Sequence, residues 1–154
     1  MVGVTIVGMR LPEFASNIPL ANLRGPSLED FIVTWEAAER YAGKPGIRGY
    51  GETWFLDGVT ATCRWLAGGT VPIPGGGFQS VSSPVLGRPV AACPESIEEE
   101  CDAVEEIGAG KRPVPVGARP GMLAGATFTL LWAWLGEDIN PIDAYLERLN
   151  ELGL

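Results

Sequence analysis

The chain has 154 residues, of which 46% are hydrophobic and 19% charged, and its formal net charge is −8. A chain of this length and composition can bury a hydrophobic core without a metal or a disulfide, and it is too apolar to be intrinsically disordered. The acidic balance argues against direct nucleic-acid binding, and the absence of histidine removes the commonest general base and metal ligand.

The three cysteines are typical of reduced thiols in a cytoplasmic protein. Cys63, Cys93 and Cys101 are odd in number and have no C-x-x-C spacing. This set resembles reduced core thiols more than an extracellular disulfide framework. The first residues lack the basic region of a signal peptide. The uncharged stretch 122–135 is shorter than the ~20 residues that cross a bilayer, so we expect a buried helix there and no membrane span.

We expect one domain, 1–154, with an N-terminal strand and arm over 1–26 and a helical body over 27–154. The β-branched residues at 2–7 predict a short strand, and the prolines that follow exclude a helix before residue 27. The arm either folds back over the core or lies on another chain.

Two helices are predicted in the first half of the body. Ser27 is placed to cap a helix that ends before Gly43, and the apolar residues after it recur at helical spacing. A second helix over 52–67 has two apolar rows, so we expect it to be central. Gly58 and Ala61 in this helix would let a neighbouring backbone approach closely.

The segment 68–92 is rich in glycine and proline and leaves no room for a long regular element. A structureless loop of this length is uncommon within a domain. The segment is therefore functional, covered by a partner, or contains short strands, for which 79–81 and 84–86 are the candidates.

Three further helices complete the predicted fold. Pro94 and Gly108 bracket the third, Pro120 opens a hydrophobic fourth that stops near Gly136, and Asn140 caps the last. The last helix has a predicted buried stripe made of Ile142, Tyr145, Leu146, Leu149 and Leu152. The fold class is thus mainly α, a compact bundle of four to five helices with a short N-terminal strand and long Gly/Pro-rich connectors.

The third helix is strongly acidic over 95–106. Its carboxylates are Glu95, Glu98, Glu99, Glu100, Asp102, Glu105 and Glu106. Such a run is most often a solvated face, less often a contact for a basic partner, and it lacks the glycine and ligand alternation of a calcium loop. Glu98, Glu99, Asp102 and Glu105 are our candidate partner-binding residues on this helix.

Trp132 and Trp134 are the other candidate partner-binding residues. Side chains two apart on a helix point in different directions, so we expect one of this pair to be exposed. Large aromatic residues are enriched at interface hot spots. A helix that is apolar on several sides is either enclosed by its own domain, which we favour, or completed by another chain.

A carboxylate pair for acid–base chemistry is a weaker candidate. Glu36 or Glu39 would have to meet Glu52 or Asp57, and nothing in the sequence sets their separation. A structural ion pair with a nearby arginine is the favoured role of Glu39. Cys63 is expected to be an inert packed thiol, whereas Cys93 precedes Pro94 at a helix start, where the helix dipole favours the thiolate.

These patterns predict a non-enzymatic interaction protein, an accessory subunit or adaptor that docks on a larger protein or on a second copy. The alternatives are an acidic inhibitor or immunity-type protein that binds a basic site through helix 95–106, and a small carboxylate-dependent enzyme. No catalytic residue, cofactor site or metal site is assigned.

Overall fold

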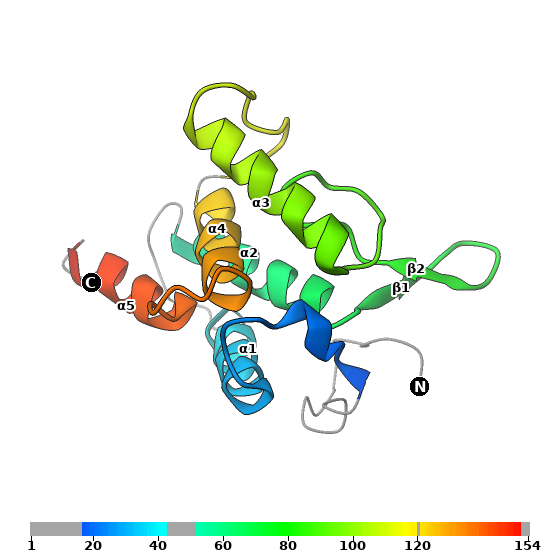
Figure 1. Ribbon diagram of the computed structural model, residues 1–154, viewed down its shortest axis with the longest axis horizontal. Coiled ribbons are helices and arrows are strands. Elements are labelled where there is room, and N and C mark those ends of the chain that lie inside the picture. Colours follow the sequence, from blue (N-terminus) through cyan, green and yellow to red (C-terminus); the bar gives the residue numbers. More distant parts are fainter. Residues whose placement is uncertain (1–16, 43–51, 120, 152–154) are drawn as a thin grey trace.

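The computed structural model describes residues 17–42, 52–119 and 121–151. Five helices occur in these ranges, together with a short 3-10 helix, η2 (Leu20–Asn22), and a two-stranded antiparallel hairpin, as Figure 1 shows. The helices are α1 (Leu28–Ala42), α2 (Glu52–Leu66), α3 (Pro94–Gly108), α4 (Met122–Ala133) and α5 (Pro141–Glu151), and the strands are β1 (Thr70–Pro72) and β2 (Phe78–Ser80). The prediction of a mainly helical bundle is confirmed.

Helix α2 is the central element, as its two apolar rows predicted, and it packs against α1, α4 and α5. At its contact with α4, backbone atoms of the two helices touch directly. A Cβ atom on Gly58 would lie 2.1 Å from the carbonyl oxygen of Met122, and one on Gly125 would lie 1.9 Å from the carbonyl oxygen of Phe55. Two glycines therefore set the distance between the two central helices.

The helix ends follow the local signals in the sequence. The Ser27 hydroxyl accepts a hydrogen bond from the Asp30 N–H at 3.1 Å, which caps α1. At the start of α5, the Asn140 side-chain oxygen accepts from the Ile142 N–H at 2.7 Å, while its amide donates to the Thr34 hydroxyl at 2.6 Å. Asn140 thus caps α5 and ties it to α1.

The segment 68–92 contains one hairpin, which projects from the body (Figure 1). Strand β2 overlaps the candidate strand at 79–81 and pairs with β1, with Val71 opposite Gln79. The candidate strand at 84–86 is wrong, because this stretch is a turn. The N–H groups of Val85 and Leu86 donate to the Glu100 side chain, and Gly87 N–H returns to the Ser83 carbonyl, so no ladder can form.

The core encloses both tryptophans of α4 and its C-terminal cap, so the prediction that one of them is exposed is wrong. Trp132 stacks on Phe31 of α1, with ring centroids 6.4 Å apart, and is buried. Trp134 is buried under Arg24, whose guanidinium lies 4.6 Å from the indole. The segment before α1 crosses the end of α4, where Arg24 and Gly25 both donate to the Ala133 carbonyl.

The stripe predicted for α5 is correct at Tyr145, which is buried, and wrong at Leu146, which is 47% exposed. Leu146 follows Tyr145 by one residue, and adjacent residues on a helix point in directions about 100° apart. The predicted strand at 2–7, most of the N-terminal arm, the Gly/Pro-rich residues 44–51 between the first two helices, and Leu152 lie outside the described residues.

Candidate functional site

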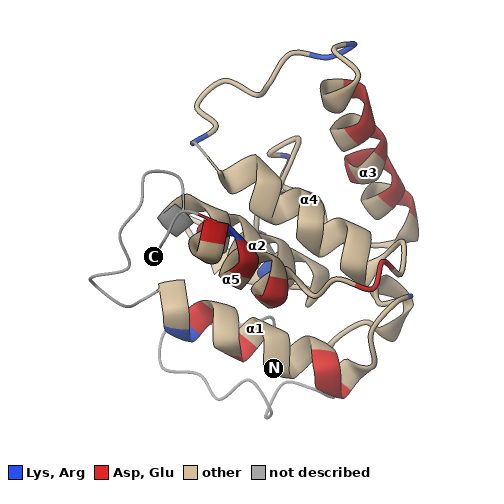
Figure 2. Cartoon of the chain, turned by 90° about the vertical axis from the view of Figure 1, so that its left-hand side faces the viewer, with Lys and Arg blue, Asp and Glu red and all other residues tan. Residues whose placement is uncertain are grey.

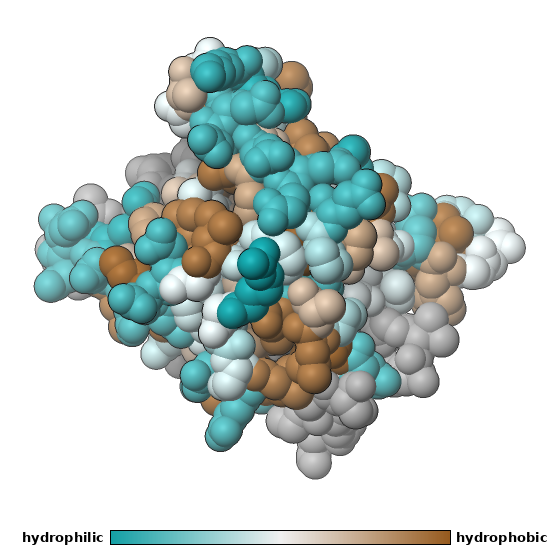
Figure 3. All heavy atoms as spheres, viewed as in Figure 1, coloured by the Kyte–Doolittle hydropathy of each residue, from teal (hydrophilic) through white to brown (hydrophobic). Residues whose placement is uncertain are grey.

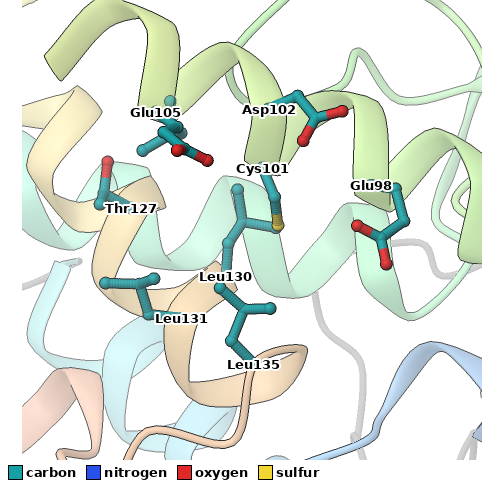
Figure 4. Close-up of a pocket in the computed structure, with 9 residues that line it drawn as sticks. Glu98, Cys101, Asp102, Glu105, Thr127, Leu130, Leu131 and Leu135 are labelled. Atoms are coloured by element: carbon teal, nitrogen blue, oxygen red, sulfur yellow. The ribbon is translucent and has the colours of Figure 1, made fainter. Parts of the chain in front are cut away.

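A groove of about 430 Å³ lies between α3 and α4. Figure 4 shows the carboxyl groups of Glu98, Asp102 and Glu105 along the α3 side and three leucines along the α4 side. The lining residues are Glu98, Cys101, Asp102, Val104, Glu105, Thr127, Leu130, Leu131 and Leu135. The groove therefore has an apolar floor and one acidic rim.

The acidic rim is exposed and mostly unpaired. Glu98, Asp102 and Glu105 are all exposed, and Figure 2 shows acidic residues along the outer face of α3. Glu98 lies 3.8 Å from Arg24, with both side chains more than half exposed. Among the described residues, Asp102 and Glu105 have no ion pair. At Asp102 and Glu105 the rim thus carries negative charge that no residue in the described part of the chain pairs with.

The apolar floor reaches the surface at its α4 end. Leu130 is buried, Leu131 is half-buried, and Leu135, in the turn after α4, is 55% exposed. In Figure 3 a hydrophobic patch over α4 lies beside the hydrophilic surface of α3. The floor of the groove is therefore an accessible apolar surface bordered by carboxylates.

The partner-binding residues predicted from the sequence include acids of the rim but none of the leucines of the floor. Three of the four predicted acids, Glu98, Asp102 and Glu105, line the groove, whereas Glu99 lies outside the lining and pairs with Arg88. Trp132 and Trp134 are in the core, so they present no surface to a partner. The signal for the floor is the pair Thr127 and Leu131, which are four residues apart and so lie on one side of α4, followed by Leu135 in the turn after the helix.

One carboxylate of the acidic helix is internal. Glu100 is completely buried, so the expectation of a wholly solvated acidic face is wrong at this position. Its Oε1 accepts hydrogen bonds from the backbone N–H groups of Val85 and Leu86 at 2.7 and 3.1 Å. Glu100 lies three residues after Ile97, on the apolar stripe of α3, and that position was the signal for its burial. It anchors the turn 83–88 to α3.

A second concavity, of about 380 Å³, brings together Glu39 and Asp57 of the candidate carboxylate pair, with Arg64 and Arg119. Arg64 donates to both oxygens of Glu39, at 2.8 and 2.6 Å, and the Trp35 indole donates to Glu39 at 2.9 Å. The predicted structural ion pair is confirmed. With both oxygens engaged, Glu39 is poorly suited to accept a proton from a substrate.

Among the described side chains, the other members of the candidate carboxylate pair do not complete an acid–base site. Asp57 is partly buried, which raises the pKa of its carboxyl despite the opposing charges of Arg119 and Arg64. The Arg119 guanidinium lies over the Trp54 ring, 4.1 Å from its centroid. Glu36 does not line this concavity, and the side chain of Glu52 lies outside the described set.

The three free thiols have different environments. Cys93 is exposed at the N-cap of α3, where hydrogen bonds from the Ser96 side chain and backbone lower the pKa of its thiol. Burial and the charges of Glu98 and Asp102 raise the pKa of Cys101 to about 11. Burial raises the pKa of Cys63 as well, which agrees with the predicted packed thiol.

We expect an alkylating reagent at pH 8 to modify Cys93 first, because the thiolate is the reactive form. Cys101 should react more slowly by about tenfold or more, and Cys63 only when the protein unfolds. Peptide mapping by mass spectrometry over time gives the three rates. Cys93→Ser should abolish the fast phase, and fast modification of Cys101 in that variant would contradict this order.

Among the described residues, no three Cys, Asp or Glu side chains are placed to hold a metal ion. No helix in the described ranges combines the length and apolarity that crossing a bilayer requires. Comparisons of the chain with protein-family models, with curated proteins and with solved structures found no match.

Proposed function

We propose that the protein is a non-enzymatic interaction protein, an accessory subunit or adaptor, that docks on a partner protein through the α3–α4 groove. The observation that carries the proposal is the exposed apolar floor, with Leu135 more than half exposed, beside three rim carboxylates. Burying an exposed leucine stabilises a complex by about 1.5–3 kcal/mol when burial is complete. Leu131 and Leu135 together supply an anchor of useful size.

The acidic rim supports specificity and association rate more than affinity. Exposed ion pairs contribute about 0–1 kcal/mol each, so Glu98, Asp102 and Glu105 alone do not hold a partner. Their summed field attracts a cationic partner and repels an acidic one. We therefore assign affinity to the leucines and selection among partners to the carboxylates.

The state of Glu39 argues against the carboxylate enzyme. Its two oxygens accept hydrogen bonds from Arg64 and Trp35, and proton transfer would require breaking that arrangement. A cytoplasmic location, which the three free cysteines support, remains part of the proposal.

A second candidate is the acidic inhibitor, which would bind a cationic site mainly through charge. It is favoured by Glu95 and Glu99, which are exposed on α3 outside the groove lining. The two candidate functions predict that different substitutions abolish binding. An inhibitor of this kind loses affinity when Glu95 and Glu99 are reversed and is insensitive to truncation of Leu131 and Leu135.

The test is recovery of a stoichiometric partner from the source cells by the full chain expressed at native level. We expect Leu131→Ala/Leu135→Ala to reduce partner recovery by about tenfold or more, because truncating an anchor residue at an interface costs more than about 1 kcal/mol and about 1.4 kcal/mol is a factor of ten in affinity. Leu146→Ala on α5 is the matched control, since Leu146 is exposed to a similar extent. Equal recovery by both variants, or no stoichiometric partner, would overturn the proposal.

A further inference from the structure

We infer that the α3–α4 groove binds a basic amphipathic α-helix of its partner, with the partner's apolar residues on the leucine floor and its cations along α3. This inference rests on the proposed function and names the occupant of the same site. It follows from three features: the spacing of the lining residues along each wall, the internal hydrogen bonding of the wall backbone, and the location of the carboxylates on α3.

Both walls of the groove repeat at helical spacing. Glu98, Asp102 and Glu105 are separated by four and three residues on α3, which at 1.5 Å per residue places the outer two about 10.5 Å apart along the helix axis. On the opposite side Thr127 and Leu131 are four residues apart on α4, and Leu135 extends this wall in the turn after the helix. A ligand helix with contacts at i, i+3 or i+4, and i+7 covers the same two turns.

An extended peptide would find little backbone to pair with in this groove. The walls are helices, whose backbone groups are bonded internally. At the end of α4, the Leu130 carbonyl accepts from Trp134 N–H and the Leu131 carbonyl accepts from Glu137 N–H. The Thr127 hydroxyl donates to the Leu123 carbonyl at 2.7 Å. A helical ligand satisfies its own backbone, whereas an extended one loses hydrogen bonds to water without replacement.

The charge lies on one wall only. All three carboxylates of the groove are on α3, and the α4 wall consists of threonine and leucine. Asp102 and Glu105 have no ion pair among the described residues, so they are open to cations from a ligand. A second copy of this chain is a poor occupant, because its net charge of −8 would bring acids against acids. The matching ligand has lysine or arginine along one flank.

The experiment measures binding of a fluorescent peptide of about 14 residues, four helical turns, to the full chain by anisotropy. The peptide has leucines at i, i+3, i+4, i+7, i+8, i+11 and i+12 and lysines at the remaining positions, so that the two residue types are equal in number. One control has the same leucines and lysines in strict alternation, which suits a strand, and the other replaces one central lysine with proline. We expect each control to bind about tenfold more weakly or worse, because neither forms the amphipathic helix.

Charge reversals on the protein separate the groove from general electrostatics. Glu98→Lys/Asp102→Lys/Glu105→Lys should weaken binding of the helical peptide by about tenfold or more. The matched variant is Asp143→Lys/Glu147→Lys/Glu151→Lys, which reverses three exposed acids on α5 and changes the net charge equally. It should leave affinity within about threefold of the wild type at ~0.15 M salt, where distant charges are screened.

The outcomes distinguish this inference from the function on which it rests. Equal binding of the helical and alternating peptides, or equal losses from the α3 and α5 reversals, overturns the helix-binding groove. If a cellular partner depends on Leu131 and Leu135 while the helical peptide fails to bind, the proposed function stands and the inference falls. If the helical peptide binds as described while no partner depends on the leucines, the proposed function falls.

Discussion

Gly58→Ala is expected to lower the free energy of unfolding by about 1–2 kcal/mol, the net of overpacking and helix propensity. Alanine in place of glycine normally stabilises a helix by about 1 kcal/mol, so propensity alone predicts the opposite sign. Here the added Cβ would lie 2.1 Å from the Met122 carbonyl oxygen and 2.9 Å from the Ala126 nitrogen. The neighbouring atoms are backbone, so α2 and α4 must separate, and overpacking of this kind outweighs the gain in propensity.

Equilibrium unfolding in denaturant measures the effect, with Gly108→Ala as the control. Gly108 is the last residue of α3, and a Cβ atom there meets nothing within 4 Å, so its substitution should be neutral or stabilising by up to about 1 kcal/mol. Gly125→Ala should resemble Gly58→Ala, because its Cβ would lie 1.9 Å from the Phe55 carbonyl oxygen. If Gly58→Ala were as stable as the wild type, the backbones of α2 and α4 would not be in contact.

The double variant Gly58→Ala/Gly125→Ala tests whether the two glycines act as one contact. A single separation of α2 from α4 relieves both clashes, so the loss should be smaller than the sum of the two single losses. Additive losses would instead mean that each clash is relieved locally.

Glu100→Ala is expected to destabilise the protein by about 3 kcal/mol, because a polar group left without its hydrogen-bond partner costs about 1–3 kcal/mol. The variant leaves the buried N–H of Val85 and the part-buried N–H of Leu86 without their acceptor. Glu100→Gln retains an acceptor oxygen in the same place, so it should lose less stability than Glu100→Ala, about 1–2 kcal/mol.

Thermal and denaturant unfolding of the two Glu100 variants provide the measurement. Glu105→Ala is the control on the same helix, and its exposed side chain should change stability by no more than about 0.5 kcal/mol. Equal losses from Glu100→Ala and Glu105→Ala would show that the Glu100 carboxylate does not hold the turn 83–88.

Helix α3 has separate roles on its two sides. Its inner side contributes Glu100 to the interior, and its outer side contributes Glu98, Asp102 and Glu105 to the groove rim. The substitutions proposed for the groove all lie on the outer side or on the α4 wall. Their effects on binding can therefore be measured in a folded protein, with unfolding curves as the check.

The amino-acid sequence by itself determined the helices and their ends. Ser27 and Asn140 cap their helices through hydrogen bonds to residues two or three positions away. Pro94 opens α3 as its fixed φ predicts, and α3 ends at Gly108, just before Gly110 takes a left-handed conformation. The central place of α2 was also readable, because two apolar rows on one helix require neighbours on two sides.

Only the tertiary structure decided which side chains those helices cover. Glu100 is buried because the turn 83–88, distant in sequence, brings two N–H groups to its carboxylate. Trp132 and Trp134 are both enclosed because α1 covers one and the segment at Arg24 covers the other. The groove exists because α3 and α4 meet with acids on one wall and leucines on the other. Helix ends depend on nearby residues in the chain, whereas burial and grooves depend on contacts between distant segments.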